Sequence, residues 1–135
     1  MILTALTKYR DFGLLFLRIG IGAMFVFVHG WPKIAGGIET WKKLGGAMGN
    51  LGITFAPEFW GFMAAITEFG GGILFAVGFL FRPATAALAF TMIVAAIMKY
   101  LPEQSFFDAA HPTEMAIVFL AMLLIGPGRF SFDRS

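Results

Sequence analysis

Few residues of this sequence have side chains that could carry out chemistry, and most of them lie within or beside apolar segments. Arg18 and Glu68 each stand alone as a charge inside a long apolar stretch. His29 and Lys33 are four residues apart, a spacing that places them on one face of a helix. His111 begins a further apolar segment. Ionisable groups are costly inside a membrane, so each of them calls for a partner or for a function such as ligand binding or proton transfer.

The composition excludes most soluble classes of protein. Of the 135 residues, 59% are hydrophobic and 13% are charged, whereas soluble domains average about 45–50% and about 25%. The formal net charge is +2 without a long block of Lys or Arg, so nucleic acid is not an expected partner. The absence of cysteine excludes disulfides, thiolate metal sites and thiol redox chemistry in this chain. We therefore expect an integral membrane protein surrounded by the lipid bilayer.

Four apolar stretches are expected to form membrane-spanning helices, because backbone groups in lipid must bond within their own segment. They run from about Phe12 to Val28, Phe59 to Phe81, Ala84 to Met98 and Met115 to Ile125. The last is short and reaches spanning length only if it starts near Pro112. We predict an all-α membrane protein, with residues 1–135 as one domain, in which four transmembrane helices form an antiparallel bundle.

Glycine and proline mark the expected helix ends. The sequence predicts that Gly30-Trp31-Pro32 ends the first helix, that Arg82-Pro83 separates the second and third, and that His111-Pro112-Thr113-Glu114 begins the fourth. A tight turn between the second and third helices would make them antiparallel neighbours. A long loop joins helices 1 and 2, and Glu39–Met48 within it could form a short interfacial helix.

The distribution of basic residues indicates an orientation in the membrane. Both termini and the turn between the second and third helices lie on one side of the membrane. That side holds Lys8, Arg10, Arg82, Arg129 and Arg134. The other side holds Lys33, Lys42, Lys43 and Lys99. Arginines lie close to the spans on the first side, so the positive-inside rule favours cytoplasmic termini.

Arg18 and Glu68 are expected at similar depths in the membrane. At a rise of about 1.5 Å per residue, their heights differ by roughly 8 Å in a core of about 30 Å. An arginine side chain can bridge most of that gap, so we predict an ion pair between them. Two alternatives stay open: Glu68 holds a ligand or a proton while Arg18 sets its charge state, or Arg18 extends to the inner interface.

The remaining polar residues are expected to gather at the opposite face of the membrane. They are His29, Lys33, Lys99, Glu103, Asp108, His111 and Glu114. Glycines at positions 20, 22 and 70–72 either leave room for a planar ligand or allow close helix packing. We predict that helices 1, 2 and 4 enclose a cavity beside Glu68, open towards the face that bears His29, Lys99 and His111.

A metal site is not expected. His111 and Glu114 have the three-residue spacing seen in carboxylate-bridged di-metal bundles. Such a site needs matching residues on other helices, and only His29 and Glu68 are available. Helix capping by the His111 segment, and a hydrogen bond from His29 to a loop, are the simpler interpretations.

Taken together, these motifs resemble the DoxX family of small four-helix bacterial membrane proteins. The matching features are Leu17-Arg18 with Gly20 and Gly22, His29-Gly30-Trp31-Pro32-Lys33, Glu68-Phe69-Gly70-Gly71-Gly72, Gly78-Phe79-Leu80-Phe81-Arg82, His111-Pro112-Thr113-Glu114 and the tail Gly126-Pro127-Gly128-Arg129-Phe130-Ser131-Phe132-Asp133. The resemblance implies a multi-pass protein of the bacterial inner membrane. It also implies a link to quinones, because relatives include membrane subunits of thiosulfate:quinone oxidoreductase.

The residues and the resemblance together predict a membrane subunit that binds a quinone or lipid-like ligand in a redox-linked system. The expected ligand-binding residues are Arg18, Phe25, His29, Glu68, Phe75, His111 and Glu114. Phe25, Phe75 and Phe79 would line an apolar slot, and the polar groups would bond the quinone oxygens or relay protons.

Other functions stay open at this point. The chain has no redox-cofactor motif, so it is not expected to be a complete oxidoreductase, and a redox partner protein or a homo-oligomer could complete it. A structural or assembly protein without ligand chemistry is one alternative. A small-molecule transporter is another, although four spans would need to oligomerise to form a path.

Overall fold

The computed structural model describes residues 2–46, 48–49, 52–103 and 106–133, and for 2, 101–103 and 106–108 it describes only the backbone. All regular elements in these ranges are helical, which confirms the predicted fold class. In chain order they are α1 (Ile2–Ala5), the 3-10 segment η1 (Leu6–Tyr9), α2 (Arg10–Met24), the π-helical segment η2 (Phe25–Gly30), α3 (Trp31–Ala35), α4 (Gly37–Gly46), α5 (Pro57–Val77), α6 (Phe81–Glu103) and α7 (Phe106–Ile125).

Several of these helices are long and apolar enough to cross a membrane. Within the described residues they are Leu3–Ala35, Pro57–Val77 and Phe81–Tyr100. A further apolar helix, Ala109–Ile125, is shorter, but α7 as a whole has 20 residues. At about 1.5 Å per residue α7 measures about 30 Å, the thickness of a hydrocarbon core. The structure therefore agrees with four spanning helices.

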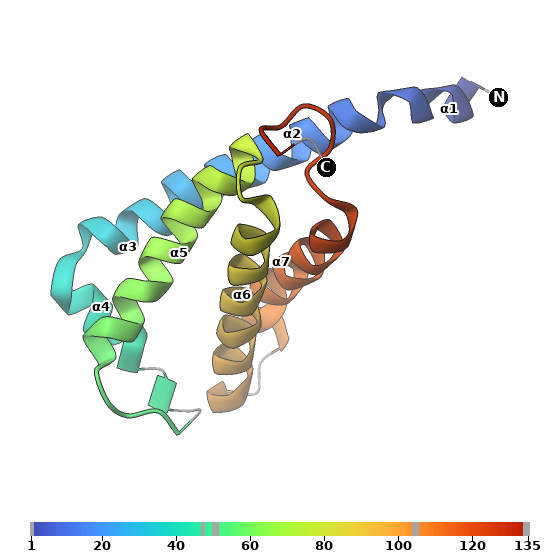
Figure 1. Ribbon diagram of the computed structural model, residues 1–135. Helices are drawn as coiled ribbons and strands as arrows, with labels where there is room; N and C mark the ends of the chain where they lie inside the picture. The colour runs from blue at the N-terminus through green and yellow to red at the C-terminus, as the bar shows by residue number, and fades with distance from the viewer. Residues whose placement is uncertain (1, 47, 50–51, 104–105, 134–135) are drawn as a thin grey trace.

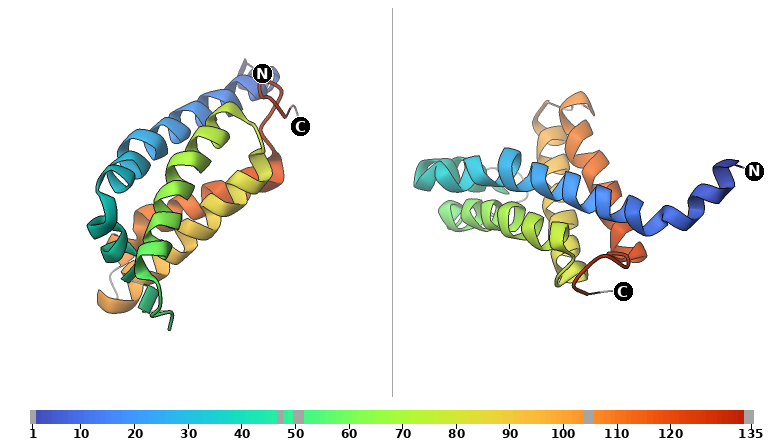
Figure 2. Two further views of the ribbon diagram at one scale, coloured as in Figure 1. Left: turned by 60° about the vertical axis from the view of Figure 1, so that its left-hand side comes forward. Right: turned by 90° about the horizontal axis from the view of Figure 1, so that it is seen from above.

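The helices alternate in direction, so the molecule has two distinct ends (Figure 1). At the terminal end lie the start of α2, the α5–α6 turn and the tail, residues 126–133. At the loop end lie α3, α4 and the first turns of α5 and α7. Figure 2 shows α2 and α5 side by side, with the α6–α7 hairpin inclined to them.

Four phenylalanines form the centre of the core, one from each spanning segment. Phe25, Phe75, Phe81 and Phe119 are each at most 2% exposed. The Phe25 and Phe119 ring centroids are 5.2 Å apart, those of Phe119 and Phe75 5.3 Å, and those of Phe75 and Phe81 5.2 Å. Aromatic pairs at such distances add to the stabilisation that burial itself provides. This cluster joins the α2–α5 pair to the α6–α7 hairpin.

The prediction that the first helix ends at Gly30-Trp31-Pro32 is wrong. The chain passes through η2, where the Trp31 N–H bonds to the Val26 carbonyl, and continues as α3 to Ala35. Proline lacks an N–H and clashes with the carbonyl four residues earlier in a regular α-helix. The wider π turn just before Pro32 relieves this conflict and keeps the helix continuous.

The prediction that the fourth helix begins at Pro112 is also wrong. α7 begins at Phe106, and Pro112 lies inside it. A proline in the second turn removes one backbone hydrogen bond, and apolar spans tolerate such a loss where neighbouring groups compensate. His111 is therefore a helical residue and not a helix cap.

The predicted tight turn between the second and third spans is confirmed, and the tail holds it in place. The turn passes through Gly78 and Leu80, whose φ angles are 75° and 48°. The Asp133 carboxylate accepts hydrogen bonds from the backbone N–H groups of Leu80 and Phe81, at 3.2 and 2.7 Å. Asp133 thus caps the start of α6, a role that the sequence did not indicate.

Glycines allow α2 and α5 to pack closely. A Cβ at Gly22 would lie 2.6 Å from Ala76 Cβ and 2.8 Å from the Gly72 carbonyl oxygen. A Cβ at Gly72 would lie 3.1 Å from Phe25 Cβ. At Gly20 and Gly70, by contrast, a Cβ would meet nothing within 4 Å. Close packing, and not space for a ligand, is therefore the role of Gly22 and Gly72.

We expect Gly22→Ala to lower stability by about 1–3 kcal/mol, because overpacking forces the two helices apart. The matched control is Gly20→Ala in the same helix, where the added methyl group meets open space. Alanine is the better helix former by about 1 kcal/mol, so the control should leave stability unchanged or raise it. Thermal unfolding in detergent measures the stability of both variants. An equal loss of stability in Gly22→Ala and Gly20→Ala would contradict the close contact of Gly22 with α5.

Candidate functional site

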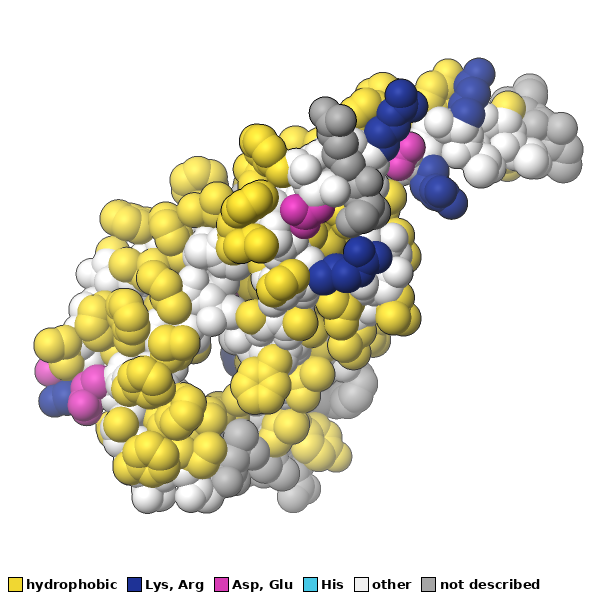
Figure 3. Space-filling model, viewed as in Figure 1, with side chains coloured by type: hydrophobic (Ala, Val, Ile, Leu, Met, Phe, Trp, Pro, Cys, Tyr) yellow, Lys and Arg dark blue, Asp and Glu magenta, His cyan; other side chains and the backbone are white. Residues whose placement is uncertain are grey.

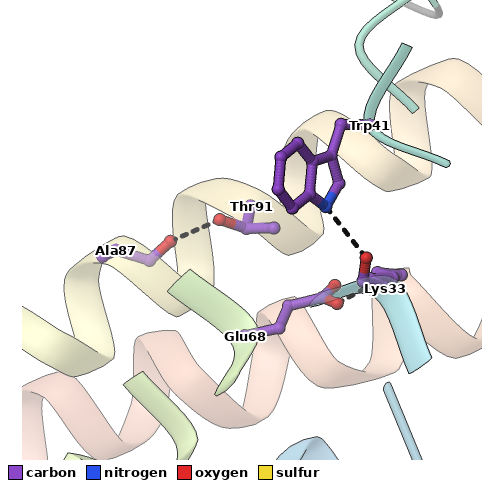
Figure 4. A network of polar contacts seen from close by, with 5 residues as sticks. All are labelled: Lys33, Trp41, Glu68, Ala87 and Thr91. Atoms are coloured by element: carbon purple, nitrogen blue, oxygen red, sulfur yellow. Dashed lines mark hydrogen bonds and ion pairs between the residues drawn. The ribbon is translucent and has the colours of Figure 1, made fainter. Parts of the chain in front are cut away.

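Four polar residues meet at the loop end and are called here the loop-end cluster: His29, Lys33, Glu68 and His111. Lys33 and Glu68 form an ion pair, and their side chains are 29% and 4% exposed. Trp41 Nε1 donates a hydrogen bond of 2.9 Å to the Lys33 carbonyl oxygen, so α4 lies against the same site (Figure 4).

The two histidines of the cluster stack on one another. Their ring centroids are 4.8 Å apart and their planes differ by 22°. His29 also contacts Phe25, at a centroid distance of 5.1 Å. His111 interacts electrostatically with Glu68, and His29 with Lys33. The expectation that His29 and His111 come together from the first and fourth spans is confirmed.

The local path of the first helix positions these side chains. His29 lies in the π-helical segment, and Gly30 follows it against α5. A Cβ at Gly30 would lie 2.7 Å from both the Cα and the N of Phe69. Glycine at this position therefore lets α3 approach α5, which brings Lys33 next to Glu68. π-helical turns often occur at functional sites, because they reorient side chains within a helix.

The predicted ion pair between Arg18 and Glu68 is wrong. Arg18 lies towards the terminal end and donates a hydrogen bond from Nη2 to the Phe130 carbonyl. Its side chain is only 1% exposed, and its Nε and Nη1 have no hydrogen-bond partner among the described residues. Because the first helix continues beyond Gly30, Lys33 lies next to Glu68 and forms the ion pair that was predicted for Arg18. Arg18 is thus not part of the loop-end cluster.

The predicted aromatic residues divide into two groups. Phe25 contacts His29 directly, and Phe75 lies one ring further into the core behind Phe119. Phe79, however, is 48% exposed and packs against Phe132 of the tail. The expectation that Phe79 lines the same slot is therefore wrong, because its place is at the terminal end.

Other polar residues that were expected at this face lie outside the cluster. Glu114 and Lys99 are exposed, and within the described part of the chain neither forms an ion pair with the cluster. The side chains of Glu103 and Asp108 are outside the described residues. No group of three or more His, Cys, Asp or Glu among the described residues is arranged to hold a metal ion.

An opening lies between two neighbouring spans of the bundle. Figure 3 shows an opening between α5 and α6 that is rimmed mainly by hydrophobic side chains. α5 and α6 meet at their turn, Gly78–Leu80, and separate towards the loop end (Figure 1). A cavity beside Glu68 that is enclosed by the first, second and fourth spans stays a prediction.

The loop-end cluster combines hydrogen-bonding groups with an aromatic wall. Each neutral imidazole offers one hydrogen-bond donor and one acceptor. The Glu68 carboxylate accepts hydrogen bonds and the Lys33 ammonium donates them. These groups can bind a polar head and move protons, while the phenylalanines behind them suit an apolar ring or chain.

Comparisons with known proteins agree with the membrane fold. The DoxX family model matches residues 13–101, which include His29, Lys33 and Glu68. Inner membrane protein YqjF of Escherichia coli (strain K12) is 32% identical over 94% of this chain and 94% of its own. Inner membrane protein YphA of the same organism is 28% identical over 94% of this chain and 96% of its own. No solved structure matches the chain.

We expect Lys33→Met to lower stability by about 3–5 kcal/mol, because it leaves the buried Glu68 carboxylate without its cation. Glu68→Gln should have a smaller effect, since Lys33 is partly exposed and can reach water. In a double-mutant cycle the two changes should be coupled by more than about 1 kcal/mol.

The matched control is a second cycle, with Arg18→Met and Glu68→Gln. These residues lie towards opposite ends, so their effects on thermal stability in detergent should add. Coupling in the control cycle, or additivity in the Lys33 cycle, would contradict the observed pairing.

Proposed function

The chain belongs to the DoxX family of membrane proteins, and we propose that it binds a quinone or a similar lipid-like ligand at the loop-end cluster. In this proposal it is the membrane subunit of a redox-linked system. The observation that carries the proposal is the His29–His111 stack, in which the exposed His111 contacts the half-buried His29 and His29 in turn contacts the buried ring of Phe25.

A quinone needs both parts of this arrangement. Its flat ring is apolar, and its carbonyl oxygens accept hydrogen bonds from groups such as imidazole N–H. His111 is exposed and His29 is half-buried, so the pair can exchange protons between the bulk and the ligand. Glu68 and Lys33 lie beside the pair and set its electrostatic surroundings.

The electrons would come from another protein. Reduction of a quinone to a quinol takes up electrons and protons in equal number. The histidines can supply the protons, but the chain has no cysteine and no redox-cofactor motif. We therefore propose a redox partner protein as the electron donor or acceptor. A homo-oligomer would be a second way to complete the site.

The proposal also includes an orientation in the inner membrane. Basic residues lie on either side of the spans, and the arginines are at the terminal end. Under the positive-inside rule the terminal end faces the cytoplasm. The loop-end cluster would then exchange protons with the outer side of the membrane.

A structural or assembly function is the second candidate. It is favoured by the close contact of Gly22 with α5 and by the tightly packed core phenylalanines. A bundle of this kind could hold a partner in the membrane without binding a small ligand.

The test is titration of purified protein with a short-chain ubiquinone or menaquinone analogue. Trp41 bonds to the Lys33 carbonyl, so its fluorescence should report binding at the cluster. We expect saturable quenching, and about tenfold weaker binding in His111→Ala and Glu68→Gln, since each removes a hydrogen bond worth about 1 kcal/mol or somewhat more.

The matched control is Glu114→Gln, which changes an exposed carboxylate on the same helix as His111 but outside the cluster. This variant should bind the analogue like the unchanged protein. Absence of saturable binding in a folded sample, or equal weakening in Glu114→Gln, would favour the structural function instead.

A further inference from the structure

The terminal end of the bundle holds a cleft that lies away from the loop-end cluster. It lies between the start of α2, the end of α7 and the tail, and it is lined by two arginines, a carboxylate and apolar side chains. We propose that this cleft binds the phosphodiester headgroup of an anionic phospholipid. Arg10 and Arg129 would contact the phosphate, and Leu14, Ile125 and Phe130 would contact the acyl chain.

The charge of this end of the molecule favours an anion. Figure 3 shows Lys and Arg side chains gathered around the N-terminal helix and the tail. The described guanidinium groups here are Arg10, Arg18, Arg82 and Arg129, and the carboxylates are Asp11 and Asp133. Each carboxylate accepts hydrogen bonds from backbone N–H groups. The positive charge of this end is therefore only partly compensated by the protein.

Arg18 adds a further positive charge next to the cleft. Its guanidinium donates to the carbonyl of Phe130, a residue that lines the cleft. It forms no ion pair with any described carboxylate, and burial removes most of its hydration. A cation that is buried without a counter-charge raises the potential nearby, because screening is weak in the interior.

Asp11 has a different role in the same cleft. Its carboxylate oxygen accepts the Arg129 N–H at 3.1 Å and so fixes the tail against α2. A Cβ at Gly128 would lie 3.0 Å from Leu14 Cδ1, which shows how closely the tail packs there. With Arg10, Arg129 and Asp11, the lining carries one net positive charge, which matches the single negative charge of a phosphodiester.

The position of the cleft favours a lipid over a soluble anion. It lies where α2 begins, within the apolar segment Leu3–Ala35, and where the apolar helix Ala109–Ile125 ends, a level at which headgroups of a bilayer are expected. Ile125 and Phe130 are 56% and 39% exposed, so they offer an apolar surface beside the arginines. Basic pockets between spanning helices are known sites for anionic headgroups. A zwitterionic headgroup would bring an ammonium group towards two guanidinium groups and should bind less well.

The experiment uses the full chain in detergent, with native mass spectrometry to measure bound phosphatidylglycerol and phosphatidylethanolamine. We expect phosphatidylglycerol to bind at least tenfold more tightly. A basic residue near a membrane surface contributes about fivefold, so Arg10→Gln with Arg129→Gln should weaken phosphatidylglycerol binding roughly 25-fold. The matched control, Lys42→Gln with Lys43→Gln, removes the same charge at the loop end and should leave the affinity unchanged.

Two further measurements complete the test. One distinguishes a lipid phosphate from a soluble phosphate, and the other uses the unchanged protein and so does not depend on the folding of a variant. Inorganic phosphate at millimolar concentration should not displace the lipid, and displacement would show a soluble-anion site instead. In the unchanged protein, a photoreactive phosphatidylglycerol should crosslink to residues 10–14 or 125–130. Equal binding of the two lipids, equal weakening in the lysine control, or crosslinks mainly elsewhere would overturn the proposal.

Discussion

The ion pair between Lys33 and Glu68 determines how the first two spans fit together. A carboxylate inside an apolar helix is stable only beside a cation or several donors, and Glu68 is almost fully buried. Lys33 supplies the cation from a part of the first helix that lies beyond Gly30. α3 must therefore stay against α5, and only glycine at position 30 leaves room for that contact. The stacking of the histidines results from the same placement.

The two ends of the bundle stabilise their buried charged side chains in different ways. At the loop end a carboxylate neutralises Lys33, and water can reach the partly exposed ammonium group. At the terminal end a backbone carbonyl from the tail partly satisfies Arg18. Between the ends lies an apolar core, in which four phenylalanines pack with leucine, alanine and methionine side chains. The molecule thus combines a hydrated polar site, an apolar centre and an electropositive end along one axis.

Local patterns predicted much of the fold, and long-range contacts decided the rest. The four helices and their alternation can be derived from hydropathy, and this alternation sufficed to bring His29 and His111 together. The partner of Arg18 could not be predicted, because it is a carbonyl 112 residues away and carbonyls leave no signal in a sequence. Similar depth in the membrane predicts Arg18 as the partner of Glu68, but the first helix continues past Pro32 and places Lys33 next to this carboxylate instead. The π turn that accommodates Pro32 depends on contact with α5, which no local pattern reports.

The π turn at Phe25–Gly30 is also the place where the first helix can change its length. It closes on hydrogen bonds that span one residue more than those of an α-helix. Loss of one residue there would restore regular α-helical winding and leave the helix before the turn nearly in phase with the helix after it, but Pro32 would then clash with the carbonyl four residues before it. Loss of one residue from α2 would instead rotate the Gly22 face by about 100° relative to Lys33, because each residue of an α-helix turns it by that angle. The turn therefore works as a spacer that keeps the Gly22 face and Lys33 on the same side of the helix.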